Sequence, residues 1–129
     1  MDLTDYFEKT QGLGVLSTAD AEGKVNAAVY SRPHVMEDST LAFIMPDRLT
    51  HHNLSSNPHA AYLFRENVPG YKGKRLYLTK VREETDPQLI ETLRRKVYPP
   101  EIDEKVGPKS VVFLKVDKEL PLVGSGESK

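Results

Sequence analysis

The sequence predicts a mainly β protein, a small antiparallel barrel with short helices on its outside. Six apolar runs of strand length recur along the 129 residues, and most are joined by short loops rich in turn-forming residues. Helix signals occur in three short segments, at 2–10, 48–55 and 86–98. A chain of this length forms one core, so we expect a single domain over 1–129 with a flexible tail from about 120.

The composition excludes several classes of function. The chain has 18 basic and 19 acidic residues and a formal net charge of -1, which favours neither nucleic acid nor an anionic membrane as a partner. It has no cysteine, so disulfides, thiolate catalysis and cysteine metal sites are ruled out. The start, MDLTDYFEKT, is acidic and no long apolar stretch follows. We therefore expect a cytoplasmic protein without a signal peptide or membrane anchor.

The first third of the chain reads as a helix followed by a hairpin. Residues 2–10 carry Leu3, Tyr6 and Phe7 at helical spacing, with an acidic or hydroxyl residue available as N-cap. An apolar strand at 13–18 leads into a loop that ends at Gly23. The next strand, 24–35, alternates between two faces. One face holds Val25, Ala27, Val29, Ser31 and Val35, and the other holds Asn26, Ala28, Tyr30, Arg32 and His34.

The junction after the next strand has the features of an anion site. The apolar run 40–45 ends at a proline, a helix is expected over 48–55, and Asn57-Pro58 prevents it from continuing. Free backbone N–H groups at a helix start, with Arg48 as a cation and Thr50 as a hydroxyl donor, suit an oxyanion such as a phosphate. The alternative also fits, because most such junctions are capped by polar residues and bind nothing.

The second half of the chain adds strands at 59–65, 73–84 and 110–116. Asp86-Pro87 is a strong helix start, and apolar residues recur at Leu89, Leu93 and Val97 before Pro99-Pro100 ends the helix. Basic residues at the start of the fifth strand are expected to be solvated or to meet a charged ligand group across a subunit interface.

Known catalytic motifs are not found in the sequence. The four histidines are His34, His51, His52 and His59, and two adjacent ones diverge by about 100° on a helix, which argues against a metal site. There is no Rossmann or P-loop glycine pattern and no GxSxG elbow. No catalytic residue can be assigned. A phosphate site without a nucleophile suggests a protein that holds a phosphorylated cofactor with its own reactivity.

Much of the chain resembles a known family. The stretch GLGVLSTADAEGKVNAAVYSRPHVMEDSTLAFIMPDRLTHHNLSSNPHAAYLF is similar to the FMN-binding split-barrel proteins related to pyridoxamine 5'-phosphate oxidase. With the later strands GKRLYLTKVREE and VVFLKVDKELPLVG, the resemblance covers nearly the whole chain. It implies a six-stranded antiparallel split β-barrel with short helices, a homodimer, and one FMN at each end of the dimer interface.

The resemblance also implies a set of FMN contacts. The flat isoalloxazine would lie along the backbone of the second strand, and the end of the third strand would contact the ring or the ribityl chain. The following helix start would hold the phosphate, with Asn53 bracing that loop and His51 as an additional donor. The implied cofactor-binding residues are Ala27, Ala28, Val29, Tyr30, Met45, Pro46, Arg48, Leu49, Thr50, His51 and Asn53.

Departures from the family pattern bear on the activity. The basic residues that pyridoxamine 5'-phosphate oxidase carries on its second strand fall near Ala28 and Pro33 here, and the chain has no tryptophan. We therefore expect an FMN-dependent oxidoreductase with an unassigned substrate, using NAD(P)H or another small reductant, rather than a true pyridoxamine 5'-phosphate oxidase. The alternatives are a non-catalytic FMN-holding or redox-responsive protein, or the same barrel binding a deazaflavin or haem.

Overall fold

The computed structural model describes residues 2–94 and 109–124, which form seven strands and three short helices. All seven strands belong to one antiparallel sheet, which agrees with the predicted antiparallel pairing. In chain order the elements are α1 (Leu3–Lys9), β1 (Gly12–Ala19), β2 (Val25–Val29), β3 (His34–Val35), β4 (Leu41–Pro46), α2 (Leu49–Ser56), β5 (His59–Glu66), β6 (Gly73–Glu84), α3 (Pro87–Leu93) and β7 (Lys109–Pro121).

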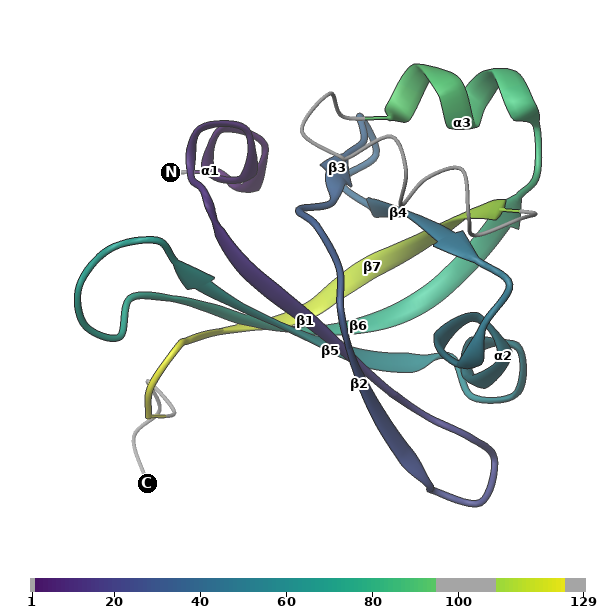
Figure 1. Ribbon diagram of the computed structural model, residues 1–129, viewed down its shortest axis with the longest axis horizontal. Coiled ribbons are helices and arrows are strands. Elements are labelled where there is room, and N and C mark those ends of the chain that lie inside the picture. The colour runs from purple at the N-terminus through teal and green to yellow at the C-terminus, as the bar shows by residue number, and fades with distance from the viewer. Residues whose placement is uncertain (1, 95–108, 125–129) are drawn as a thin grey trace.

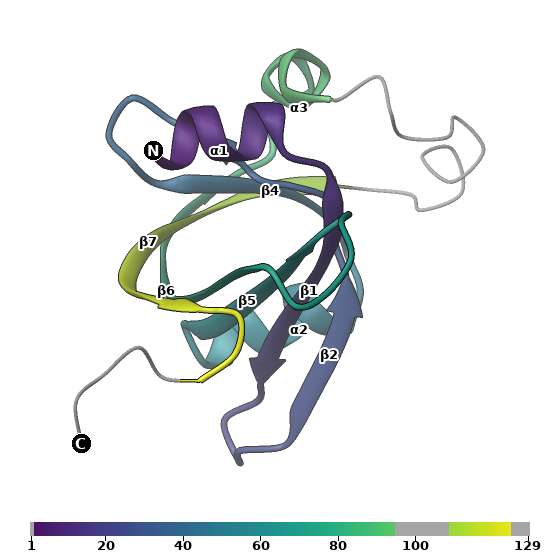
Figure 2. The same cartoon turned by 90° about the vertical axis from the view of Figure 1, so that its left-hand side faces the viewer.

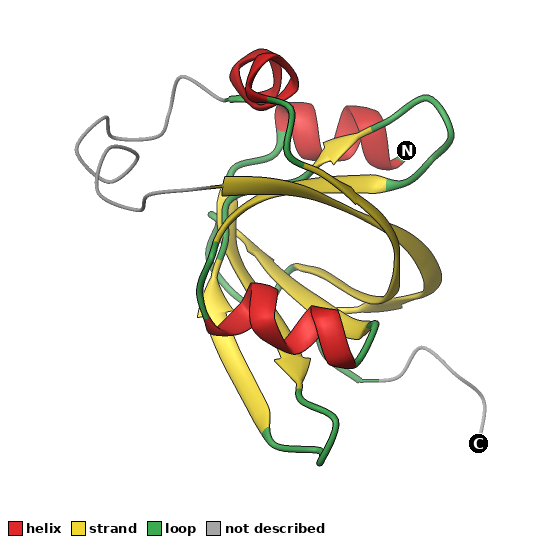
Figure 3. Ribbon diagram, turned by 90° about the vertical axis from the view of Figure 1, so that its right-hand side faces the viewer, coloured by secondary structure: helices red, strands yellow, loops and turns green. Residues whose placement is uncertain are grey.

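The sheet curls strongly but does not close into a barrel. Its strand order is β2-β1-β5-β6-β7-β4-β3, so β2 and β3 are the two edges. The long strands β6 and β7 pair with two register shifts, between Tyr77 and Leu78 and between Lys80 and Arg82, and such bulges increase curvature. In Figures 2 and 3, α1 and α3 lie near one end of the curled sheet and α2 lies near the other.

The strand predicted over 24–35 is two strands, which corrects the expected number from six to seven. β2 pairs with β1, whereas β3 pairs with β4 at the opposite edge of the sheet. The chain leaves the first pairing before Pro33, which has no N–H to donate to a ladder. The hydroxyl of Tyr62 donates to the carbonyls of Tyr30 and Ser31, at 3.2 and 3.1 Å, and so fixes this crossing segment.

Local signals explain where several elements begin and end. Gly23 has φ of 86°, a conformation that favours glycine, and the Oδ1 atom of Asp20 accepts hydrogen bonds from the backbone N–H groups of Glu22 and Lys24. At the start of α3, Asp86 caps the helix by accepting from Gln88 N at 3.0 Å, as predicted. The predicted positions Val97 and Pro99-Pro100 lie outside the described residues.

The core fills the inside of the curled sheet. Aromatic rings pack edge to face there, including Phe7 of α1 against Phe64 of β5, with ring centroids 5.4 Å apart. Gly14 is required at its position because a Cβ there would come within 1.9 Å of the Tyr62 hydroxyl oxygen. The largest fully buried side chains are Tyr62, Phe7, Phe64, Phe113, Leu16, Leu41, Met45, Leu76, Leu78, Leu114, Val111 and Val112.

A second, smaller apolar cluster lies on the outer side of the sheet. Leu93 of α3 packs there with Val111 and Phe113 of β7. β7 continues to Pro121, and Leu120 is 8% exposed, so the ordered strand extends beyond the expected end at 116 and into the region expected to be a tail. In the described part of the chain, no helix is long and apolar enough to span a membrane.

Candidate functional site

The predicted anion site lies where α2 meets the β1–β2 hairpin (Figure 1). Asn53 of α2 donates through Nδ2 to the Thr18 hydroxyl of β1 at 3.1 Å, and both residues are buried. Asn26 of β2 donates through Nδ2 to the Thr50 hydroxyl of α2 at 3.4 Å. The first bond ties the helix to β1, and the second ties its first turn to the edge strand β2.

Arg48 stands at the N-cap of α2 with an extended backbone, φ -134° and ψ -166°. Its side chain makes no capping hydrogen bond and is exposed, as is that of Leu49, which follows it. Within the described residues the Arg48 guanidinium has neither a hydrogen bond nor an ion pair. The structure therefore presents one cation to solvent at the positive end of a helix dipole, which is the arrangement that attracts an anion.

Three of the sequence-predicted residues point inward instead. Met45 is fully buried in the core, Thr50 is 3% exposed, and Asn53 is 4% exposed. The Thr50 hydroxyl already accepts from Asn26. Because these side chains face the interior, they position the loop around the anion site, and Pro46 is half-buried beside them at the end of β4.

His51 is held by carboxylates on both sides of its ring. Nε2 lies 2.7 Å from a Glu83 carboxylate oxygen of β6, and Nδ1 lies 3.1 Å from a carboxylate oxygen of Asp47. Burial lowers the pKa of His51, but the hydrogen bonds to Glu83 and Asp47 outweigh it, so the pKa is raised overall. Both ring nitrogens are thus engaged within the protein. Among the described residues, no three histidine or acidic side chains are grouped to hold a metal ion.

The resemblance implies that the flavin ring lies along the backbone of β2, which among the described strands pairs only with β1 and so has one open edge. Tyr30 N donates to Gly14 O at 3.0 Å, and antiparallel pairs alternate between bonded and non-bonded positions. The backbone N–H and C=O groups of Ala27 and Val29 therefore point away from β1, toward the free edge. An unpaired strand edge is a row of donors and acceptors for a ligand. Ala28 is half-buried on the inner face.

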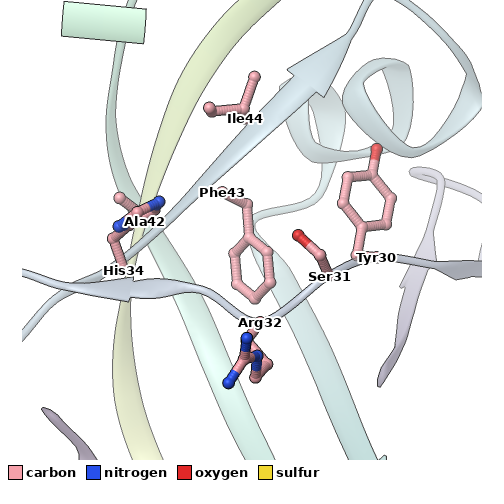
Figure 4. A pocket seen from close by; sticks show the side chains of 7 residues that line it. All are labelled: Tyr30, Ser31, Arg32, His34, Ala42, Phe43 and Ile44. Atoms are coloured by element: carbon pink, nitrogen blue, oxygen red, sulfur yellow. The ribbon is translucent and has the colours of Figure 1, made fainter. Parts of the chain in front are cut away.

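The polar face predicted for the second strand is divided in the structure. Arg32 donates through Nη1 to the carbonyls of Phe7 and Thr10, each at 2.9 Å, and so anchors the end of α1. Tyr30 packs edge to face on Phe43, with ring centroids 6.1 Å apart. A recess lies between residues 30–34 and β4. Its volume is about 10 Å³, which has room for about one water molecule. Figure 4 shows its lining by Tyr30, Ser31, Arg32, His34, Ala42, Phe43 and Ile44.

The outer face of the sheet carries exposed apolar side chains in register. Val15 of β1 lies opposite both Val29 of β2 and Leu63 of β5. Val29 is 70% exposed and Leu63 is 40% exposed. Val25, at the start of β2, is 83% exposed. On a strand with one face packed on the core, the side chains of the other face are normally polar where they meet water. This apolar outer face is therefore a candidate contact surface.

Sequence reasoning did not identify Asn26 or Glu83 as parts of this site. The alternation of the strand puts Asn26 on the correct face, but its partner Thr50 lies 24 residues away. Glu83 lies 32 residues from His51, in a strand whose charged ends read as solvated. No sequence signal specifies such a contact, since it depends on how α2 packs beside β6.

Comparisons with solved structures place this fold. No protein-family model and no curated protein matches the sequence. An FMN-binding protein from Syntrophomonas wolfei matches with a TM-score of 0.73 and 20% identity, covering 95% of this chain and 84% of that one. HupZ from Group A Streptococcus matches with a TM-score of 0.69 and 19% identity, covering 98% of this chain and 96% of that one. A putative pyridoxamine 5'-phosphate oxidase from Lactobacillus delbrueckii matches with a TM-score of 0.65 and 18% identity, covering 92% of this chain and 89% of that one.

These likenesses extend over nearly the whole chain at low sequence identity, so they bear on architecture. They agree with the open antiparallel sheet and with the resemblance drawn from the sequence motifs. The chain therefore has the split-barrel-like fold of FMN-binding and pyridoxamine 5'-phosphate oxidase-like proteins.

Proposed function

We propose that this protein binds FMN, with the phosphate at the start of α2 and the isoalloxazine along the free edge of β2. The observation that carries the proposal is the bond from Asn26 to Thr50, because it joins the two surfaces that one FMN molecule would need. Arg48 and the free backbone N–H groups of the first helical turn supply the positive end for a phosphate. Neither surface alone would select for a flavin nucleotide.

The residues present fit this cofactor in two respects. Ala27 and Ala28 have small side chains, so a flat ring can approach the β2 backbone closely. The Arg48 guanidinium faces solvent without a carboxylate partner among the described residues, so no internal ion pair has to break when a phosphate binds. Thr50 and His51 contribute to this arrangement by fixing the position of the helix start, through their contacts with Asn26 and Glu83.

We propose further that the protein is a homodimer formed through the apolar outer face. The row Val29, Val15 and Leu63 crosses three neighbouring strands on the face opposite the core. A second copy is the occupant that this face fits, since the row continues to the β2 edge, where the flavin ring would lie. A partner chain placed there would cover the open side of the ring and complete the site.

Bound FMN would supply electron or hydride transfer, and the chain would supply binding and orientation. We propose an oxidoreductase role with NADH, NADPH or another small molecule as reductant. The β2 edge would align the ring through backbone hydrogen bonds, while Arg48 would fix the phosphate and thereby the position of the ring along the strand. A protein that holds FMN without turnover is the alternative within the same binding function.

A second candidate ligand is a deazaflavin. An F420 reductase has the same fold, with a TM-score of 0.62 and 16% identity over 92% of this chain and 97% of that one. A deazaflavin ring would use the same strand edge, because its flat shape and hydrogen-bonding edge resemble those of a flavin.

Parallel titrations of the purified protein with FMN, riboflavin and F420 test the proposal. We expect FMN to bind with quenching of its fluorescence, and riboflavin to bind more weakly by about tenfold or more, because it lacks the phosphate. The flavin that copurifies should be released on denaturation as FMN. If FMN and riboflavin bind equally, the phosphate site is wrong. If only F420 binds, the second candidate replaces the first.

A further inference from the structure

Glu83 of β6 holds the helix that carries the proposed anion site. Its carboxylate lies 2.7 Å from His51 Nε2 on one side and 2.8 Å from Lys80 Nζ on the other. His51 in turn reaches Asp47, at 3.1 Å, in the turn just before Arg48. A continuous set of contacts thus runs from the middle strand of the sheet to the residue next to the proposed phosphate ligand.

The geometry around His51 suits the imidazolium form. A neutral imidazole has one N–H, whereas here both ring nitrogens face carboxylate oxygens, so both contacts are hydrogen bonds only when the ring is protonated. Burial raises the pKa of Glu83, but hydrogen bonds from Lys80, His51 and Ser110 outweigh it and lower the pKa to about 2. The carboxylate therefore stays ionised at neutral pH and favours the charged imidazole.

The charged groups that face His51 come from the turn before α2 and from β6. On the turn before α2 the group facing His51 is Asp47, and on β6 it is Glu83 with Lys80 behind it. On β7, Ser110 bonds to Glu83, while Lys109 has Arg94 and Glu91 as its electrostatic neighbours. The described residues around the ring therefore favour its positive charge.

We propose that Glu83 is a positioning residue for the anion site, acting through His51 so that the site holds its ligand most tightly while that imidazole is protonated. This inference rests on the proposed function, because the ligand it concerns is the FMN phosphate. When His51 loses its proton, one of the two contacts is lost, and the turn that carries Asp47 and Arg48 is no longer tied to β6. Affinity for a phosphate-bearing ligand then falls.

The test compares two quantities over the same pH range. The first is the pKa of the His51 imidazole, measured by NMR and assigned by the signal that disappears in His51→Gln. The second is the FMN dissociation constant, measured alongside that of riboflavin, which lacks the phosphate. In the unmodified protein we expect FMN affinity to fall about fivefold as pH rises through the His51 pKa, with riboflavin affinity unchanged.

Glu83→Gln removes the carboxylate but keeps a side chain able to hydrogen-bond. It should lower the His51 pKa and move the fall in FMN affinity to lower pH by the same amount. Glu84→Gln is the matched control, because Glu84 is the next residue on β6 and pairs with Arg82 instead. It should leave both quantities unchanged. The FMN phosphate ionises in the same way in every titration, so comparing the variants at the same pH removes its effect from the difference in FMN affinity.

The outcomes separate this inference from the proposed function. If FMN does not bind at any pH, the proposed function fails, and the NMR titration alone still shows whether Glu83 sets the His51 pKa. If FMN binds but its affinity falls at the same pH in the unmodified protein and in Glu83→Gln, the fall is caused by ionisation of the FMN phosphate, and the inference is overturned. An ordinary His51 pKa in the unmodified protein would overturn it as well.

Discussion

The side-chain amide of Asn53 lies 3.1 Å from the hydroxyl oxygen of Thr18, in a buried contact that ties α2 to β1. Asn53→Ala should lower the free energy of unfolding by about 1 to 3 kcal/mol, because it removes a buried hydrogen bond and leaves the Thr18 oxygen without its donor. Urea denaturation measures the change. Ser55→Ala on the exposed face of the same helix is the control and should have little effect. Equal stability of both variants would contradict this reading of Asn53.

Arg48→Ala should weaken FMN binding by about 10- to 100-fold, corresponding to about 1.5 to 3 kcal/mol for a charge-assisted contact. Riboflavin affinity should not change, since riboflavin has no phosphate for Arg48 to hold. Fluorescence titration measures both constants. Lys115→Ala removes an exposed positive charge from β7 and serves as the control. An unchanged FMN affinity in Arg48→Ala would show that the phosphate lies elsewhere.

Val29→Asp should convert the proposed dimer to a monomer. A carboxylate buried at an apolar interface costs several kcal/mol, so we expect the dimer dissociation constant to rise by about 100-fold or more. Sedimentation velocity measures the association state, and FMN affinity should fall in parallel. Val123→Asp changes a valine that is similarly exposed, at 62%, but lies beyond the end of β7. A monomeric unmodified protein would contradict the dimer proposal directly.

Glu83 should contribute to the pH dependence of stability. Its folded pKa of about 2 lies below the value of 4.5 for an unperturbed glutamate, so its contribution is present above about pH 4.5 and is lost as pH falls toward 2. The shift corresponds to something on the order of 2 to 3 kcal/mol for this side chain, which is 25% exposed. Urea denaturation at several pH values should show a smaller acid-induced loss in Glu83→Gln than in the unmodified protein. A similar reduction in Glu84→Gln would argue against a specific role for Glu83.

If the protein is an oxidoreductase, the form with FMN bound should oxidise NADH or NADPH and pass the two electrons from the flavin to an added acceptor such as dioxygen or a redox dye. Loss of the reduced nicotinamide absorbance under steady-state conditions measures this activity, and protein freed of flavin is the control. Arg48→Ala should lower the rate at limiting FMN and recover when FMN is in excess, because the substitution affects binding of the cofactor. Failure with all common reductants would favour an FMN-holding protein without turnover.

Much of the fold follows from short-range signals in the sequence. Asp86-Pro87, Asn57-Pro58 and Gly23 act through local backbone geometry, so the boundaries they set appear in the structure as expected. Short loops between consecutive apolar runs also predict antiparallel pairing, because such a loop joins strands that run in opposite directions. The division of residues 24–35 was missed because the alternation of faces continues through Pro33, although the two halves pair at opposite edges of the sheet.

The candidate site depended more on tertiary packing. The sequence by itself determined that a cation stands at a helix start, since Arg48 follows a strand that ends at a proline. Only the folded chain decided that Thr50 turns inward to Asn26 and that His51 is bridged by Glu83. Such contacts join residues far apart in the chain, and their formation depends on how α2 packs against β1 and β2 and on where β6 passes His51, which no local pattern of residues specifies.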